Sequence, residues 1–463
     1  MPQPMSSSET SFDHLKSEGD LNLSPVRDEW HATTLDAETR RLLDEDARYF
    51  LHQSLSTPCL NVLTRAKGAL IEDVQGRRYL DFHGNQVHQV GFDNPAVIEA
   101  IKKQLDDLSF CTRRYTNRVA INLAKRLSEM ASGDLNRVLL APGGAEANGM
   151  ALKLARVATG RHKIISMWDS FHGATLETIS VSGVQAFRRG IGPLLTGVEH
   201  APPPDEYRCL WECGSRGGCD LKCANYIEYV LEKEGDVAAV IAEPVRGIPY
   251  IPRPEYWQQI RAACDHHGAL LIFDEIPYAL GRTGKMFVCE HFGVVPDMLV
   301  LGKGLGGGIL PLAALIAREG LNVAAEQSLG HYTHEKNPVL CAAALATLDT
   351  IQANRLPDKA RQMGDYALNR LRQIQAEQPL IGDVRGLGLL LGVELVRNRD
   401  TKERATAEAE QVMYAALRRG LSFKLMMGNI IGLNPPLTIS RPEMDAALDI
   451  LNEAITEVTT NGG

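Results

Sequence analysis

The sequence predicts an α/β fold, with a large domain built on a mostly parallel sheet and a smaller α+β domain. Three observations indicate this class. Short continuous apolar runs alternate with segments of helical spacing, the pattern of strands covered by helices on both faces. Charged residues directly follow several of these runs, where the carboxyl ends of parallel strands form a ligand site. The C-terminal part of the chain has a more mixed pattern, which indicates a second unit.

Five apolar runs are the candidate strands of the large sheet, at 163–167, 238–242, 269–273, 298–301 and 312–317. Helical spacing occurs between or before these runs, at 147–157, 224–234 and 255–266. Glu243, Asp274 and Lys303 each follow one of the runs closely. Because the carboxyl ends of parallel strands lie at one edge of a sheet, we expect these three side chains to share one site.

The C-terminal part predicts helices at 357–377, 405–419 and 441–459, with strand regions at 384–395 and 429–439. We divide the chain into three parts. Residues 1–82 form an N-terminal arm and part of the small domain, 83–335 form the large domain, and 336–463 form the C-terminal small domain. Such an arrangement suits a chain of 463 residues.

The composition narrows the class of protein. The chain is 44% hydrophobic and 23% charged, an ordinary globular balance. Its net charge of −8 predicts no nucleic-acid partner, since such proteins carry basic patches. The longest apolar stretches, such as 311–317, are too short to cross a bilayer. The first 20 residues lack the basic and apolar parts of a signal peptide. We therefore expect a cytoplasmic protein without membrane contact.

Lys303 is the most informative residue of the chain. It follows the apolar run 298–301 and begins a glycine-rich turn. A buried lysine can lose its charge and act as a nucleophile or base. A lysine combined with a carboxylate such as Asp274 is the pattern of a site for pyridoxal phosphate (PLP), where the carboxylate pairs with the pyridinium nitrogen. The alternative is a buried ion pair of structural role, which is costly to fold.

Two further segments are candidates for holding such a cofactor. Gly143, Gly144 and Ala145 form a turn that begins an amphipathic helix, and a helix N-terminus suits a phosphate group. An ordinary loop-to-helix junction is the alternative. Phe171 precedes His172 and Gly173, and its ring could stack on a planar ligand; taken alone, the motif favours a core position instead.

Together these motifs resemble the class III aminotransferases of PLP fold type I, over nearly the whole chain from about residue 50. The carrying motifs lie at 143–147, 171–173, 243–247, 273–276, 281–284, 303 and 333–338. The resemblance implies a seven-stranded sheet between helix layers and a bound PLP. It implies that Lys303 and Asp274 are catalytic, with Lys303 bonded to the cofactor and Asp274 on its ring nitrogen.

The resemblance also implies the rest of the cofactor site and the assembly. The implied PLP contacts, besides Lys303 and Asp274, are Gly143, Gly144, Ala145, Phe171, His172, Glu243 and Thr333. Of these, Thr333 would reach the phosphate bound by a neighbouring subunit. A homodimer is therefore expected, alone or within a tetramer.

The sequence departs from the family pattern at the substrate end of the expected site. Gly432 stands where many relatives have an arginine that binds the substrate α-carboxylate, three residues before Pro435. Ile248 stands where many relatives have a glutamate that neutralises this arginine. The absence of both the arginine and the glutamate indicates that this chain has lost the switch by which they let one pocket accept two different substrates. Some transaminases of unusual amines also vary here.

New hydrogen-bond donors accompany this loss. We predict that His88, Arg113, Arg114 and Arg246 face the substrate, since such donors suit a phosphonate or phosphate. The alternatives are packing, surface or subunit-contact roles. Pro277 replaces a glutamine of the family, which removes a contact to the cofactor's ring oxygen.

Variants at 83–89, 274–277 and 332–338 resemble the subgroup of the family that acts as (R)-1-hydroxy-2-aminoethylphosphonate ammonia-lyases. The resemblance implies elimination to phosphonoacetaldehyde and ammonia, without a keto acid. One alternative is an ω-aminotransferase that passes an amino group to a keto acid such as pyruvate. A third is a ligand-binding protein without turnover, which the intact Lys303 and Asp274 disfavour.

Four cysteines lie in one polar segment, at Cys209, Cys213, Cys219 and Cys223. A structural zinc site and a reduced surface loop are the two interpretations. Zinc patterns usually contain paired cysteines two residues apart with a longer gap between pairs, so we predict no metal.

Overall fold

A seven-stranded sheet forms the centre of the large domain, in the order β4-β10-β9-β8-β7-β5-β6. Neighbouring strands are parallel except at β10, which is antiparallel to both β4 and β9. The expectation of a mostly parallel, seven-stranded sheet is confirmed. The strands are β4 (Leu135–Ala141), β5 (Lys163–Met167), β6 (Val198–Ala201), β7 (Val237–Ala242), β8 (Leu270–Asp274), β9 (Met298–Leu301) and β10 (Ala313–Arg318).

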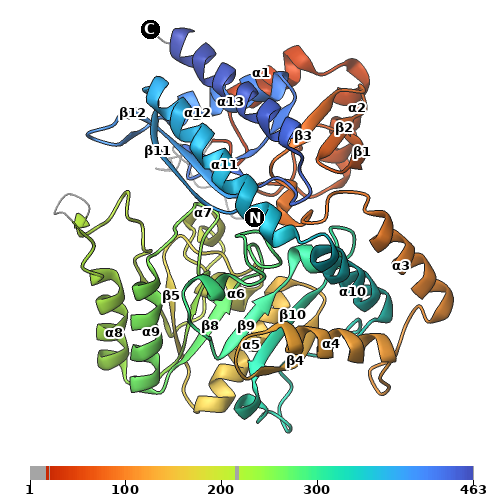
Figure 1. Ribbon diagram of the computed structural model, residues 1–463, viewed down its shortest axis with the longest axis vertical. Helices are drawn as coiled ribbons and strands as arrows, with labels where there is room; N and C mark the ends of the chain where they lie inside the picture. Colours follow the sequence, from red (N-terminus) through yellow and green to blue (C-terminus); the bar gives the residue numbers. More distant parts are fainter. Residues whose placement is uncertain (1–16, 20, 214–217, 462–463) are drawn as a thin grey trace, which may run out of the picture.

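This computed structural model describes residues 17–19, 21–213 and 218–461, and Figure 1 shows the large domain below the small one. Helices cover both faces of the large sheet. On one face, α5 (Gly144–Thr159) packs its Met150 into an apolar cluster with Ile272. On the other, α9 (Pro254–His267) places Trp257 edge-on to Phe273, with ring centroids 4.9 Å apart. Consecutive residues of β8 thus face opposite helix layers, which is why these strands are apolar throughout.

The other large-domain helices are short or lie toward the edges of the sheet. They are α3 (Pro95–Asp107), α4 (Arg118–Met130), α6 (Leu176–Val181), α7 (Gln185–Arg188), α8 (Lys222–Glu234) and α10 (Pro338–Ala353). The Asn337 side chain accepts hydrogen bonds from Val339 N at 2.9 Å and Leu340 N at 3.2 Å, so it caps α10. Because α10 packs against α3 and α4, the chain passes into the small domain after this helix, later than residue 336.

The small domain has a second sheet, in the order β11-β12-β16-β15, with β13 paired to β12. Its strands are β11 (Ile381–Leu387), β12 (Leu390–Asn398), β13 (Glu403–Arg404), β15 (Lys424–Met426) and β16 (Ile430–Leu433). Its helices are α11 (Leu356–Glu377), α12 (Thr406–Arg418) and α13 (Arg441–Asn461). The predicted strand region 384–395 is a pair of antiparallel strands joined by a turn at Gly388 and Leu389.

The N-terminal segment belongs spatially with the small domain. It contains α1 (Pro25–Thr34), α2 (Ala37–Tyr49), β1 (Leu63–Lys67), β2 (Leu70–Asp73) and β3 (Arg78–Asp81). Strand β3 pairs in parallel with β14 (Leu421–Ser422), so Leu80 lies opposite Leu421. Figure 1 shows these N-terminal elements beside α12 and α13. The chain therefore leaves the small domain for the large one near residue 82.

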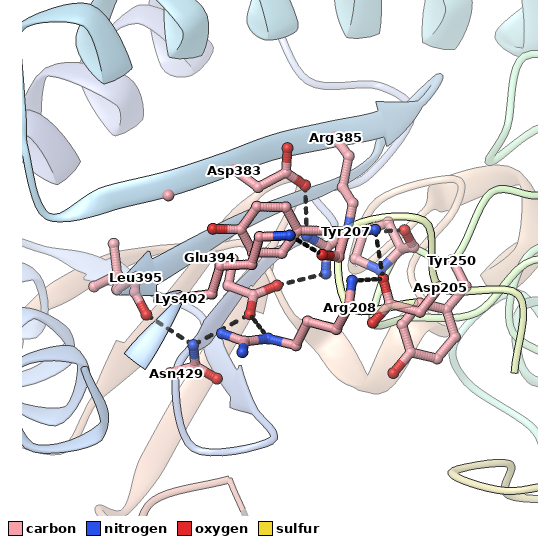
Figure 2. A network of polar contacts seen from close by, with 12 residues as sticks. Asp205, Tyr207, Arg208, Tyr250, Asp383, Arg385, Glu394, Leu395, Lys402 and Asn429 are labelled. Carbon is pink, nitrogen blue, oxygen red and sulfur yellow. Dashed lines mark hydrogen bonds and ion pairs between the residues drawn. The ribbon is translucent and has the colours of Figure 1, made fainter. Parts of the chain in front are cut away.

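A network of ion pairs joins the two domains (Figure 2). The Glu394 carboxylate on β12 accepts hydrogen bonds from Arg208 Nε at 2.6 Å and Arg385 Nη2 at 2.9 Å. Arg385 also donates to Asp383 Oδ2 at 2.6 Å and to the Pro249 carbonyl at 3.0 Å. Arg208 and Pro249 belong to loops of the large domain. The network therefore holds these loops against the small-domain sheet. Within the described residues, no helix is long and apolar enough to span a membrane.

Candidate active site

A cavity of about 570 Å³ lies at the carboxyl edge of the large sheet, where the small domain closes over it. Glu243, Asp274 and Lys303 all line this cavity, as their positions after strands β7, β8 and β9 led us to expect. Residues 83–86 and the small-domain strands β15 and β16 supply further parts of its wall. The three strand ends therefore meet in one site, formed between the domains.

The Lys303 amine is held by one amide. Its Nζ donates a hydrogen bond to Gln86 Oε1 at 2.9 Å, and Gln86 Nε2 in turn lies 3.5 Å from the Tyr278 hydroxyl. Lys303 has φ +44° and Gln86 has φ +61°, a left-handed conformation that costs energy in residues with side chains. Such strain is typical of functional sites, where the surroundings hold the residue in place.

Burial changes the proton affinity of this amine. The pKa of Lys303 falls to about 8, chiefly because burial disfavours the charged form. Glu243 and Asp274 oppose the fall in pKa, and the Lys424 ammonium adds to it. Near neutral pH a sizeable fraction of Lys303 is therefore the free amine, the form that attacks a carbonyl or accepts a proton.

Asp274 is almost inaccessible and is held by an amide, an imidazole and a backbone N–H. Its Oδ2 accepts hydrogen bonds from Asn148 Nδ2 at 2.7 Å and from His172 Nδ1 at 2.8 Å, and its Oδ1 accepts one from Ile276 N at 3.1 Å. The side chain of Asn148 also donates to the His172 carbonyl at 2.9 Å. Asn148 and His172 thus fix the carboxylate at the cavity wall, and His172 contacts Asp274 besides lining the cavity.

The start of α5 provides a cradle for an anion. Gly144 and Ala145 line the cavity, and Gly143 precedes the helix as an N-cap residue that provides no side-chain hydrogen bond. A Cβ on Gly144 would come within 2.7 Å of Ile276 Cδ1, so the first turn fits closely against the wall. The N–H groups of an uncapped first turn suit a phosphate. The anion cradle suits the phosphate of PLP, the carboxylate suits its ring nitrogen, and the amine suits its aldehyde. The residues present therefore fit this cofactor.

Phe171 lies on the same cavity and packs against Phe187, with ring centroids 4.6 Å apart. Its N–H donates to Glu243 Oε1 at 3.0 Å, and Arg246 Nε approaches the same oxygen at 3.3 Å. Arg246 lines the cavity as predicted, and its Nη1 is buried without a hydrogen-bond partner among the described residues. Arg246 therefore has a donor left for a bound ligand.

The other predicted substrate residues lie elsewhere in this chain. His88 is fully buried, its ring packs 4.9 Å from that of Phe92, and burial lowers its pKa to about 3. This is a packing position outside the cavity lining. Arg113 and Arg114 are exposed, and Arg113 forms an ion pair with Glu335 at 3.2 Å. Thr333 is also exposed and lies outside the cavity of its own chain.

The departures from the family pattern do face the cavity. Gly432, Ile248 and Pro277 all line it. A Cβ on Gly432 would stand 2.5 Å from Met426 Cε, so the thioether occupies the space of a side chain there. Neither an arginine nor its neutralising glutamate is present at these positions.

Reasoning from sequence did not single out Gln86 and Lys424, which line the cavity, or Asn148, which holds Asp274 from behind the wall. Asn148 lies one helical turn after Gly144, a spacing that places both on one side of α5. That spacing was the available signal. Gln86 lay in a segment recognised only as rich in polar donors, and Lys424 had no motif around it.

The four-cysteine segment forms a separate cavity of about 290 Å³. Cys209, Cys213, Cys219 and Cys223 all line it, each as a free thiol. The Cys213 thiol donates to Asp220 Oδ1 at 3.2 Å. Among the residues outside 1–16, 20, 214–217 and 462–463, no three His, Cys, Asp or Glu side chains are arranged to hold a metal ion.

A lysine, a carboxylate and an anion cradle at the carboxyl edge of this sheet define a PLP-dependent enzyme of fold type I. The chain belongs to the class-III aminotransferase family, whose sequence pattern matches residues 52–455. It is 48% identical over 459 residues to the (R)-1-hydroxy-2-aminoethylphosphonate ammonia-lyase of Vibrio splendidus, covering 96% of each chain.

Solved structures agree with this assignment. An aminotransferase of Bacillus anthracis has a TM-score of 0.85 and 32% identity, covering 92% of this chain and 100% of that one. A PLP-bound amine transaminase of an uncultivated Pseudomonas species has a TM-score of 0.82 and 31% identity, covering 88% and 98%. The fold and the cofactor are therefore those expected from the motifs.

Proposed function

We propose that this protein is a PLP-dependent ammonia-lyase that acts on a small amino-alkylphosphonate, with (R)-1-hydroxy-2-aminoethylphosphonate as substrate. The observation that carries the proposal is the cavity itself. Its cofactor end keeps Lys303 and Asp274. At its substrate end, Gly432 and Ile248 stand where the family pattern has the arginine and the glutamate that let one pocket accept both amino and keto acids. The 48% identity to the Vibrio splendidus ammonia-lyase supports it.

The roles of the cofactor residues follow from their geometry. PLP, when bound, supplies a ring that accepts electrons from the carbon bearing the substrate nitrogen. Asp274, fixed by Asn148 and His172, is placed to keep a ring nitrogen protonated. The first turn of α5 would hold the phosphate, and Phe171 would pack against the ring.

Lys303 moves the proton in the proposed reaction. Its pKa of about 8 lets the free amine take a proton from the carbon bearing nitrogen. Gln86 holds Nζ in place between proton transfers. Hydroxide leaves from the neighbouring carbon and is released as water after protonation. The resulting enamine then takes up water to give phosphonoacetaldehyde and ammonia, so no keto acid and no net oxidation are required.

The test uses the purified protein with PLP and (R)-1-hydroxy-2-aminoethylphosphonate, without any keto acid. We expect many equivalents of ammonia per subunit, with the absorbance of the bound cofactor restored after substrate is consumed. Ammonia or aldehyde that forms only when pyruvate is added would contradict the lyase. It would establish the ω-aminotransferase, which the transaminase neighbours favour. Ligand binding without product from any amine would indicate a binding protein.

We also propose that two subunits complete each site, as a homodimer in the cytoplasm. In support, Thr333 is exposed and lies outside the cavity of its own chain, and Arg113 forms an ion pair with Glu335, two residues after Thr333 in the sequence. Light scattering should give twice the subunit mass. Thr333→Val, which removes the hydroxyl but keeps the shape, should weaken PLP binding about tenfold, the worth of one hydrogen bond to a charged group. A monomer, or unchanged PLP affinity, would contradict this arrangement.

A further inference from the structure

The small-domain wall of the cavity places a cation directly across from Gly432. Strands β15 and β16 are antiparallel, and Lys424 is the residue opposite Gly432 in their register. Side chains directly opposite each other in such a pair lie on the same face of the sheet. Both residues line the cavity. A lysine therefore stands on the strand next to position 432, where the family pattern has an arginine.

The charge of Lys424 is felt inside the cavity. It contributes to the lowered pKa of Lys303, about 8, and to that of His83, about 3, although burial is the largest cause of both shifts. Coulomb effects of this kind require proximity, because they fall with distance and with screening. Lys424 is thus electrically coupled to the residues at both the cofactor end and the 83–86 wall.

Two features of the site favour a compact oxyanion over a planar carboxylate. A lysine ammonium is a point charge with three donors, whereas an arginine fork matches a planar carboxylate with two parallel hydrogen bonds. Met426 Cε also occupies the space that a side chain at Gly432 would need. Arg246 also lines this cavity and brings a second positive charge to it, paired with Glu243 at 3.3 Å.

We infer that Lys424, with Arg246, forms the subsite that binds the phosphonate dianion of the substrate, in place of the arginine at position 432. The inference rests on the proposed function for its substrate. It concerns a binding contact, however, and can be measured without turnover.

The experiment measures binding of 2-hydroxyethylphosphonate, which lacks an amine and cannot react with the cofactor. Calorimetry on the PLP-loaded protein compares wild type with Lys424→Met, Lys424→Arg and Lys359→Met. Lys359 is an exposed lysine of α11, and its replacement makes the same change of charge in the same domain. 3-Hydroxypropanoate, the carboxylate counterpart, tests discrimination between the two anions.

Loss of a charge-assisted contact predicts a dissociation constant roughly 10- to 100-fold higher for Lys424→Met. Lys424→Arg should retain most of the affinity, and Lys359→Met should equal wild type. Wild type should bind the carboxylate at least tenfold more weakly than the phosphonate, since one charge and one oxygen are absent. Thermal melting and the absorbance of bound PLP check that each variant is folded and loaded.

The outcomes separate the two proposals. Wild-type affinity in a folded Lys424→Met protein overturns the subsite, whatever the enzyme does to its substrate. Failure of wild type to bind the phosphonate overturns it as well. If binding depends on Lys424 but no ammonia is released from the substrate, the lyase proposal fails and the subsite stands.

Discussion

Two buried carboxylates, Asp274 and Glu394, have almost the same exposure and opposite surroundings. Asp274 is 1% exposed and Glu394 is fully buried. Glu394 lies between two guanidinium groups, those of Arg208 and Arg385 (Figure 2). Among the described residues, the side chains that contact Asp274 are an amide and an imidazole. One carboxylate is neutralised within the chain, whereas the other faces a cavity with its charge available to a ligand.

The difference separates a structural role from a functional one. A buried charge is expensive unless it is paired, and Glu394 meets that condition with its own protein. Among the described residues, Asp274 has no guanidinium partner; it faces the cavity, where its charge acts on the Lys303 ammonium. Its donors fix its position, which places a carboxylate where the ring nitrogen of PLP requires one. The predictions below test this contrast, from the largest expected effect to the smallest.

Lys303→Ala should abolish turnover, because it removes both the bond to the cofactor and the base. The absorbance band of lysine-bound PLP should disappear while the free-cofactor band remains. Lys285→Ala, a control at an exposed lysine of the same domain, should keep both the band and the activity. A persisting band in Lys303→Ala would show that another amine holds the cofactor.

Asp274→Asn should reduce kcat by about 10²–10³-fold, the range for removing one preorganised electrostatic contact. The amide keeps the shape of the carboxylate and, through its oxygen, can still accept from Asn148 and His172, but it loses the bond from Ile276 N and the charge needed at the ring nitrogen. The melting temperature should change little. A large loss of stability with normal kcat would place Asp274 in the same structural class as Glu394.

Glu394→Gln should give the reverse result. It removes the carboxylate that Arg208 and Arg385 share and leaves Arg385 with Asp383 alone, so the free energy of unfolding should fall by about 3 kcal/mol. The kcat per folded molecule should stay within a few-fold of wild type. Urea unfolding and active-site titration with PLP together measure both quantities. A stable but inactive variant would mean that the domain network acts directly on catalysis.

Gly432→Arg should cost about 1–3 kcal/mol of stability, because Met426 must move to admit a side chain. It should also weaken phosphonate use or permit binding of an α-carboxylate. Gly432→Arg with Met426→Ala relieves the overlap, and should recover stability while keeping the change in preference. If neither variant alters substrate preference, position 432 does not contact the substrate.

Acid should weaken the ion-pair network between the domains by protonating Glu394. Burial raises the pKa of Glu394, but Arg385 and Arg208 outweigh it, and its net pKa lies below the ordinary value. A lowered folded-state pKa adds stability that is fully present above the unfolded pKa, near 4.3, and is lost as pH falls through the folded value. Wild type should therefore lose more stability below about pH 4.3 than Glu394→Gln, by at most about 1.4 kcal/mol per pH unit. Equal slopes would show that Glu394 is not the responsible group.

The cofactor end of the site could be predicted because its signals are local. Lys303 and Asp274 follow apolar runs that form buried strands, and Gly144 begins a helix. Lys424 could not be found this way, since its importance depends on which strand β15 pairs with and in which register. The strand region predicted at 429–439 forms only at Ile430–Leu433, and the partner strand was not predicted at all.

In the segment 83–90, too, the sequence could not predict which side chains face the cavity. Polar residues there predicted contact with the substrate, but composition does not tell in which direction each side chain points. Gln86 turns toward Lys303, while His88, two residues later, packs into the interior. The positive φ angles of Asn85 and Gln86 set this division, and sequence patterns rarely predict such angles in residues other than glycine.

The β15–β16 hairpin has a further consequence. It supplies Lys424, Met426 and Gly432 to the cavity, whereas Lys303, Asp274 and the α5 cradle come from the other domain. If Lys424 binds the substrate anion as inferred, part of the substrate preference is encoded apart from the residues that react with the cofactor, and Arg246 is the large domain's contribution to that preference. Recombination or directed evolution confined to 424–433 could redirect the enzyme to another anion while the reaction machinery is inherited unchanged.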